Sequence, residues 1–133
     1  MSSSPCPCGS GKKFSDCCGR YLDGGEYADD AERLMRSRYS AYTLRREDYL
    51  LATWYVSTRP AALHLEETDI HTRWLGLNVK RYYCNPLQPD RAEVEFVARY
   101  KNGGGRAHRL HEISHFVREQ DRWFYVDGET DND

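Results

Sequence analysis

The sequence predicts an α+β domain with an antiparallel sheet, preceded by a small cysteine-rich segment. Four of the five cysteines lie between residues 6 and 18, where few core-forming residues accompany them. Apolar residues then recur with helical spacing over residues 29–44, and stretches that favour strands follow from residue 73. Helices first and strands afterwards are typical of domains in which helices cover an antiparallel sheet.

The helical region begins after the pair Gly24-Gly25. Its buried stripe recurs at spacings of three and four residues and comprises Ala31, Leu34, Met35, Arg38 and Tyr42. Asp29 is the expected N-cap, and Glu32, three residues later, completes a capping box. A second short helix is predicted over residues 46–55, whereas residues 60–71 fit either a short helix or a loop.

Four strands are predicted in the rest of the chain, and the turns between them indicate a meander. The predicted strands cover residues 73–84, 91–101, 107–118 and 123–126. The tail after Asp127 is acidic and is expected to be frayed. The expected organisation is a cysteine-rich module over residues 1–25, an α+β domain over residues 26–129 and an acidic tail over residues 130–133.

Composition excludes several classes of protein. Three Trp, ten Tyr and four Phe among 133 residues exclude a chain that is disordered throughout. Nineteen basic and twenty-one acidic residues give a net charge of −2, which argues against a nucleic-acid binder, so no specific DNA binding is expected. No apolar run approaches the roughly 20 residues of a membrane span. The N-terminus lacks the pattern of a secretory signal, so a cytoplasmic location is expected.

The cysteine cluster predicts a metal site. Cys6 and Cys8 are followed, after eight residues, by the adjacent pair Cys17-Cys18. Four thiolates complete the tetrahedral coordination of zinc, and a closed shell of this kind is typical of a structural site. Disulfides and a redox-active pair are the alternatives, but a reducing compartment argues against disulfides, and a bond between adjacent cysteines is strained. We therefore expect one structural Zn²⁺.

Residues 6–19, CPCGSGKKFSDCCG, resemble the SEC-C motif, a zinc-binding segment best known from the tail of the preprotein translocase ATPase. The resemblance implies that the zinc ligands are Cys6, Cys8, Cys17 and Cys18. It also implies that the middle of the motif is a surface offered to a protein partner, possible partners being the export chaperone and the ribosome. That partner-binding surface comprises Lys12, Lys13 and Phe14.

The rest of the chain is similar to the YchJ-like family of small bacterial SEC-C proteins. The similarity rests on LMRSRYSAY (34–42), DYLLATW (48–54), STRP (57–60), WLGL (74–77), EVEFVARY (93–100), RLHEISHFVRE (109–119) and WFYVDGE (123–129). It implies a cone-shaped, cystatin-like α+β domain resembling nuclear transport factor 2, in which helices close over a strongly bent antiparallel sheet. It does not imply a particular reaction.

Residues 111–115, HEISH, match the H-E-x-x-H pattern of zinc proteases. That chemistry requires a helix, because on a strand residues four apart are separated by about 13 Å and cannot share one ion. The motif follows a glycine-rich turn after a clear strand and precedes strand-forming residues, so we interpret it as part of a strand. One face of that strand then carries His111 and His115, and the other carries Glu112 and Ser114.

Two functions remain open at this point. The first, which the sequence favours, is a zinc-stabilised adaptor that binds a protein through the cysteine-rich module. The second is a small-molecule-binding or enzymatic domain, resembling a dehydratase or an isomerase, whose candidate residues are His111, Glu112 and Tyr39. An interior cavity with convergent polar groups would favour the second function, and an interior filled by side chains would favour the first.

Overall fold

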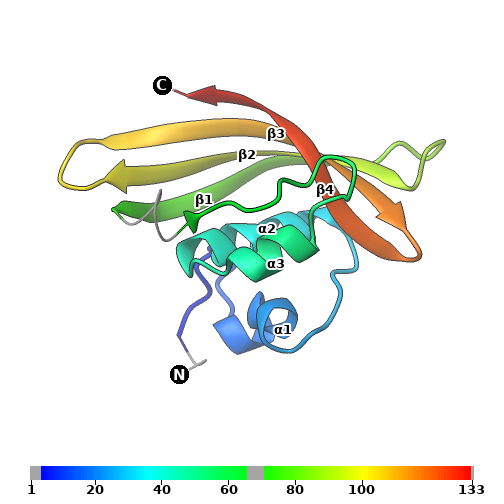
Figure 1. Ribbon diagram of the computed structural model, residues 1–133, viewed down its shortest axis with the longest axis horizontal. Helices are drawn as coiled ribbons and strands as arrows, with labels where there is room; N and C mark the ends of the chain where they lie inside the picture. Colours follow the sequence, from blue (N-terminus) through cyan, green and yellow to red (C-terminus); the bar gives the residue numbers. More distant parts are fainter. Residues whose placement is uncertain (1–3, 66–70, 133) are drawn as a thin grey trace.

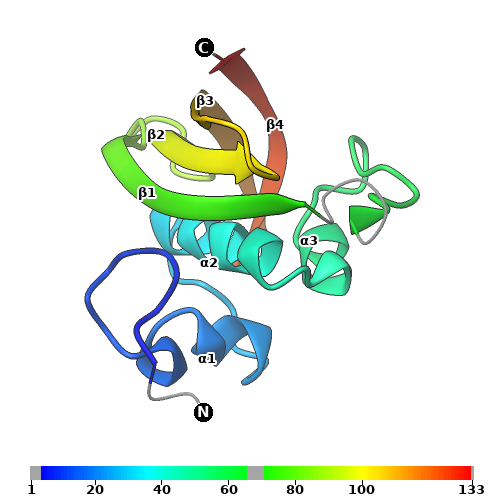
Figure 2. The ribbon, with the colours of Figure 1, turned by 90° about the vertical axis from the view of Figure 1, so that its left-hand side faces the viewer.

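The computed structural model describes residues 4–65 and 71–132. Helices lie on one side of a curved four-stranded antiparallel sheet, which confirms the predicted α+β class (Figure 1). A short 3₁₀ helix, Phe14–Asp16, and the single-turn helix α1, Gly19–Leu22, belong to the N-terminal segment. Helix α2, Ala31–Thr43, lies between that segment and the sheet, and α3, Glu47–Ala52, packs beside α2 (Figures 1 and 2).

The sheet is a meander in the order β1-β2-β3-β4, with every neighbouring pair antiparallel. Its strands are β1 (Thr72–Tyr83), β2 (Arg91–Asn102), β3 (Ala107–Glu119) and β4 (Arg122–Asn132). Strands β3 and β4 meet at a two-residue turn, in which Gln120 and Asp121 both have positive φ angles, 52° and 64°. Turns with two such residues match the twist of the strands that they join.

Irregular pairing bends the sheet. The register shifts between Trp74 and Gly76, between Val79 and Arg81, and between His115 and Phe116. Such bulges increase the local twist of a strand and curve the sheet. The result is the strongly bent sheet that the family resemblance implied, arching over α2 (Figures 1 and 2).

Strand β4 is longer than predicted, and the expectation that the acidic tail after Asp127 is frayed is wrong for residues 128–132. These residues continue the ladder with β3, where Thr130 pairs with Glu112 and Asp131 pairs with His111. The apolar alternation that marks a strand stops at Val126, because polar residues and Gly128 follow it. The strand is extended by backbone pairing with β3, and the residue pattern of the tail does not predict this pairing.

Helix α2 begins one residue later than predicted, so the expected capping box of Asp29 and Glu32 does not form. Asp30 is the N-cap, and its carboxylate accepts a hydrogen bond from the amide of Arg33 at 2.8 Å. Asp29 instead forms an ion pair with the guanidinium of Arg33 at 3.1 Å. Glu32 is then the second helical residue. Its carboxylate pairs with the Nε atom of Arg36 at 3.0 Å, one turn later, and does not bond to the N-cap amide as a capping box requires.

Helix α2 is buried on two sides. Most of the predicted stripe faces the sheet, since Met35, Arg38 and Tyr42 line the space between α2 and the strands. A second buried side, which the stripe did not predict, includes Ser37, Ser40 and Ala41. Figure 2 shows why: the N-terminal segment lies below α2 while the sheet lies above it. The helix is therefore the middle layer of the fold.

Helix α3 is shorter than the predicted 46–55 because the chain after Ala52 runs beside β4. The amide of Tyr125 donates to the carbonyl oxygen of Thr53 at 2.9 Å, and the amide of Tyr55 donates to the carbonyl oxygen of Tyr125 at 2.7 Å. Of the ambiguous stretch 60–71, residues 60–64 are irregular, and residues 66–70 lie outside the described part of the chain.

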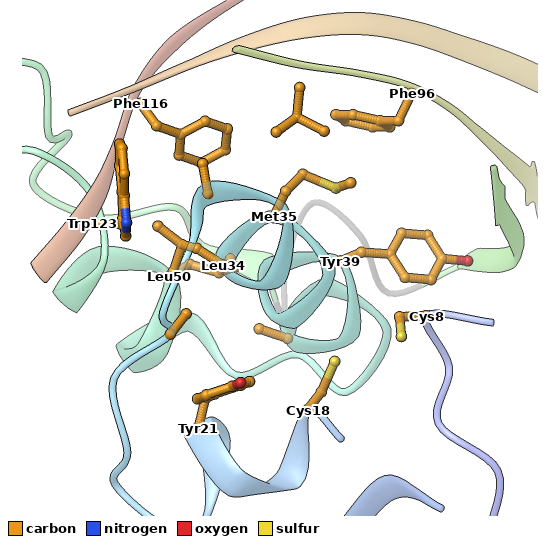
Figure 3. Packing of buried hydrophobic residues seen from close by; sticks show 14 of the residues in the cluster. Cys8, Cys18, Tyr21, Leu34, Met35, Tyr39, Leu50, Phe96, Phe116 and Trp123 are labelled. Atoms are coloured by element: carbon orange, nitrogen blue, oxygen red, sulfur yellow. The ribbon is translucent and has the colours of Figure 1, made fainter. Parts of the chain in front are cut away.

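The sheet, the helices and the N-terminal segment share one hydrophobic core (Figure 3). On the sheet side of α2, Phe96 and Phe116 pack over Met35. On the other side, Cys8 and Cys18 belong to the same buried cluster. Folding of the cysteine-rich segment therefore completes the core beneath α2.

None of the helices in the described part of the chain has the length and apolar character needed to span a membrane.

Candidate metal centre

The structure brings together the four cysteines that the sequence grouped. Cys6 and Cys8 lie on an irregular loop, Cys17 follows the 3₁₀ helix, and Cys18 immediately precedes α1. Their four Sγ atoms all lie within 4.8 Å of one another. The first and second cysteine pairs therefore face the same point, although eight residues separate them.

Two glycines allow the first pair to reach that point. Gly9 and Gly11 have φ angles of 79° and 86°, which side-chain-bearing residues rarely adopt. The amide of Gly9 donates to the carbonyl oxygen of Cys6 at 3.2 Å, and the amide of Cys6 donates to the carbonyl oxygen of Lys12 at 3.0 Å. These bonds close the loop and fix the directions of both cysteine side chains.

A close approach of two backbone segments positions the second pair. A Cβ atom on Gly19 would lie 2.7 Å from the carbonyl oxygen of Phe14 and 3.0 Å from its ring, so a larger residue cannot occupy this site without movement. The amide of Cys17 donates to the same carbonyl oxygen at 3.0 Å. The absence of a side chain at Gly19 thus lets α1 start directly behind Cys17 and Cys18.

The distance between thiols distinguishes a metal site from a disulfide. The Sγ atoms of Cys8 and Cys17 are 3.6 Å apart, whereas a disulfide bond is about 2.05 Å long. Four sulfurs at about 2.3 Å from a tetrahedral zinc ion lie roughly 3.8 Å from one another. All five cysteines, each of them in the described part of the chain, are free thiols. The geometry fits a shared ion.

The thiols strongly influence one another's protonation. Hydrogen bonds from the thiols of Cys18 and Cys8 hold the pKa of Cys6 far below its usual range. The hydrogen bond that Cys18 gives to Cys6, together with burial, raises the pKa of Cys18. Metals bind the thiolate form of cysteine, so an ion bound here would displace the proton that the thiol of Cys18 retains.

The burial of the four thiols fits a structural ion. Cys6, Cys8 and Cys18 are buried, and Cys17 is partly exposed, with its Sγ atom 3.1 Å from the hydroxyl oxygen of Ser10. Cys6 contacts α2 through the hydroxyl oxygen of Ser40, 3.6 Å from its Sγ atom. Four sulfur ligands leave no position for substrate, so an ion here would stabilise the segment rather than catalyse a reaction.

A cation on α2 also approaches the cluster. Arg36 donates from Nη1 to the carbonyl oxygen of Cys8 at 3.1 Å, while its Nε atom pairs with Glu32 at 3.0 Å. Sequence reasoning missed this role, because Arg36 lies 28 residues from Cys8 and belongs to no motif. Together with Lys12, Arg20 and Arg33, it lines a groove of about 350 Å³ beside Cys17 and Cys18.

The expected partner surface is partly available. Lys12 and Lys13 are exposed, whereas Phe14 is half-buried and packs against the core. The ring of Phe14 also lies against Gly19. The structure thus shows two exposed lysines beside a phenylalanine that contributes to packing.

The H-E-x-x-H sequence lies on β3, as predicted, and its residues are divided between the faces of the sheet. On the face away from α2, His111 approaches Glu95, with Nε2 2.7 Å from Oε2, and His115 approaches Asp127 at 2.7 Å. Glu112 lies on the opposite face, towards α2. The arrangement of a zinc protease is therefore absent.

The second set of candidate residues is also only partly assembled. Glu112 and Tyr39 line a cavity of about 240 Å³ between α2 and the sheet, but His111 does not, because neighbouring residues on a strand point to opposite faces. The structure therefore brings Glu112 and Tyr39 together and does not bring His111 to them. The cavity nevertheless shows that side chains do not completely fill the interior.

The polar lining of this cavity includes Arg38, Tyr39, Tyr42, Glu112, Ser114 and Tyr125. Burial lowers the pKa of Arg38 from its ordinary value. Burial also raises the pKa of Tyr39 to about 12. With a pKa this high, Tyr39 is unsuited to exchange protons near neutral pH.

Comparison with known proteins assigns both parts of the chain. Residues 3–20 match the SEC-C motif, and residues 30–128 match the family described as YchJ, middle NTF2-like domain. A UPF0225 protein of Methylibium petroleiphilum is 58% identical over 127 residues, covering 96% of this chain and 89% of that protein. A UPF0225 protein of Chromobacterium violaceum is 55% identical over 124 residues, covering 92% and 90%.

Solved structures agree with this assignment. The solution structure of a SEC-C motif containing protein from Rhodopseudomonas palustris matches with a TM-score of 0.82 and 37% identity, covering 93% of this chain and 96% of that one. The crystal structure of a SEC-C motif containing protein from Psychrobacter arcticus matches with a TM-score of 0.78 and 32% identity, covering 95% and 82%.

Proposed function

Because this chain belongs to the YchJ family, in which a SEC-C motif accompanies a middle NTF2-like domain, we propose that it is a zinc-stabilised protein-binding adaptor. The N-terminal segment, residues 4–25, presents the binding surface, and the α+β domain carries it. The convergence of four sulfur ligands within 4.8 Å of one another is the observation that supports this proposal most directly.

Zinc is the ion that we propose for this centre. Four thiolates are soft ligands, and a closed tetrahedral set of them is typical of structural zinc. Zinc has no redox chemistry, so it would hold the loop and α1 together without a reaction of its own. A reducing compartment such as the cytoplasm would keep the thiols available for the metal.

The exposed lysines define the partner-binding surface. Lys12 and Lys13 lie between the two cysteine pairs, so the metal would fix their positions. The half-buried ring of Phe14 provides an apolar contact beside them. Such a surface suits an acidic protein or ribonucleoprotein partner, and we propose the export chaperone and the ribosome as the first candidates to test.

Affinity purification with the full chain tests the proposal. Charge reversal by Lys12→Glu together with Lys13→Glu should reduce recovery of the partner severalfold, because it repels an acidic surface, without releasing the metal. The matched control reverses Lys80 and Lys101 on the sheet, far from the cysteines in sequence, and should leave recovery unchanged. Equal recovery of the partner with both double variants would refute the proposed surface. Loss of metal from the Lys12/Lys13 variant would also count against it, because reduced recovery would then reflect a loss of stability.

A further inference from the structure

The cavity between α2 and the sheet contains two charged side chains whose hydrogen-bonding capacity is only partly used. We propose that this cavity binds an uncharged, mainly apolar small molecule that carries a hydrogen-bond acceptor for Arg38 and a hydrogen-bond donor for Glu112. The proposal uses no residue of the N-terminal segment, so it stands or falls separately from the adaptor function.

Arg38 provides the unused donors. Its side chain is buried, with 5% of the residue exposed, and its Nη1 atom donates to the carbonyl oxygen of Leu50 at 2.8 Å and to the hydroxyl oxygen of Thr53 at 2.7 Å. Among the described residues, none accepts a hydrogen bond from its Nε or Nη2 atom, and none offers it a carboxylate within ion-pairing distance. A buried guanidinium ordinarily has such a partner.

Aromatic rings hold this guanidinium in place. Its central carbon lies 4.5 Å from the ring centroid of Tyr125 and 5.0 Å from that of Trp54. These cation–π contacts, together with the two bonds from Nη1, fix the group without using its remaining N–H donors. An acceptor on a ligand would therefore meet a donor that is already oriented.

Glu112 provides the unused acceptor. Its Oε2 atom accepts hydrogen bonds from the hydroxyl groups of Ser114 and of Tyr125, the latter at 3.3 Å. Its Oε1 atom accepts none from the part of the chain that the structure describes. Because two hydroxyl groups occupy Oε2 and orient the carboxylate, Oε1 remains as the atom available to a ligand.

A glycine on the neighbouring strand makes room for this carboxylate. A Cβ atom on Gly128 would lie 2.7 Å from the Cδ atom of Glu112, so the carboxylate lies directly over the backbone of β4. The φ angle of Gly128 is not in the left-handed region, so the glycine is needed here for space rather than for its conformation. Both strands therefore form the site: β3 carries Glu112, and β4 provides the space for its carboxylate.

The charges and walls of the cavity define the class of ligand. Arg38 and Glu112 carry opposite charges, so the site is neutral overall and a charged ligand would leave one charge uncompensated. Met35, Phe96 and Leu110 contribute apolar walls. At about 240 Å³, the cavity is as large as about eight waters at ~30 Å³ each, which suits one aromatic ring with a small polar substituent.

Benzamide and acetophenone form a matched pair of probes for this prediction. They share the ring and the carbonyl acceptor, but only benzamide has an N–H donor for Glu112. Titration of the full chain, followed by ¹H–¹⁵N NMR, should shift amides of α2 and β3 around the cavity with both probes. Benzamide should bind roughly tenfold more tightly, because a hydrogen bond to a charged acceptor is among the stronger ones.

Variants then test whether Glu112 causes the preference for benzamide. Glu112→Met should make the two affinities equal, and Glu95→Gln, on the opposite face of the sheet, should retain the tenfold preference. If Glu112→Met does not fold, Glu112→Gln provides the same comparison with less change in shape, and it should weaken the preference. Equal affinities of the two probes for the unaltered chain, tighter binding of benzoate, or shifts confined to other surfaces would overturn the proposal.

Discussion

Arg36 on α2 donates a hydrogen bond from Nη1 to the carbonyl oxygen of Cys8, 3.1 Å away. This bond joins the middle layer of the fold to the loop that carries the first cysteine pair. Since Cys6 also contacts α2 through Ser40, the helix is a template against which the metal-binding loop folds. The N-terminal segment and the α+β domain are consequently coupled in stability.

The first prediction tests that coupling. Arg36→Ala should lower the free energy of unfolding by roughly 1–3 kcal/mol, because it removes a charged donor from the carbonyl group of the buried Cys8. Arg33→Ala, one turn earlier on the same helix, is the matched control: its ion pair with Asp29 is exposed, so its loss should cost roughly 0–1 kcal/mol. Urea unfolding measures both, and equal losses would show that the contact with Cys8 contributes nothing specific.

The second prediction concerns removal of the metal. A chelator should expose the amides of residues 4–22 to hydrogen exchange while strands β1 to β4 stay protected, because only the N-terminal segment depends on the ion for its fold. The melting temperature of the remaining domain should also fall, since Cys8 and Cys18 belong to the core beneath α2. Unchanged exchange in residues 4–22 after chelation would contradict the structural role of the ion.

The third prediction concerns the crossing of two backbone segments at Gly19. Gly19→Ala should destabilise the protein by roughly 1–3 kcal/mol and weaken metal binding, because its Cβ atom would meet the carbonyl oxygen of Phe14 at 2.7 Å. Gly104→Ala is the control, since nothing lies within 4 Å of its Cβ position. Thermal unfolding of the two variants would reveal no difference if the close approach were unimportant.

The fourth prediction concerns pH. The hydrogen bond from His111 holds the pKa of Glu95 below its usual range. The depressed pKa means that this interaction stabilises the folded protein above the unfolded pKa of Glu95, and that the contribution is lost as the pH falls through the lower, folded pKa. His111→Leu should therefore return the pKa of Glu95 towards its usual range in a carboxyl NMR titration, whereas His71→Leu should not change it.

The sequence predicted much of the fold because the deciding signals are local. The spacing of the four cysteines, the helical periodicity after Asp29 and the alternation over residues 91–101 each lie within a short stretch of chain. For the same reason the strand assignment of His111 was correct, since its neighbours favour strands. These elements occur where a local pattern places them, with boundaries shifted by about one residue.

The remaining features depend on contacts between distant segments. Helix α3 and the N-terminal segment cover the second buried side of α2: Ser37 contacts Tyr49 of α3, and Ser40 contacts Cys6. Serine is more often exposed than buried, so the residue types alone do not predict this burial. The end of β4 is set by pairing with β3, although its own residues are polar. The carboxylate of Glu112 is placed by Gly128 on another strand, which no spacing within either strand reveals.

Elemental analysis of freshly purified, reduced protein tests the central claim most directly. We expect one zinc ion per chain, and we expect Cys17→Ser to lower this ratio because a ligand is lost. The absence of a stoichiometric metal, or an intact mass that is short of two hydrogens because two cysteines have joined, would contradict it.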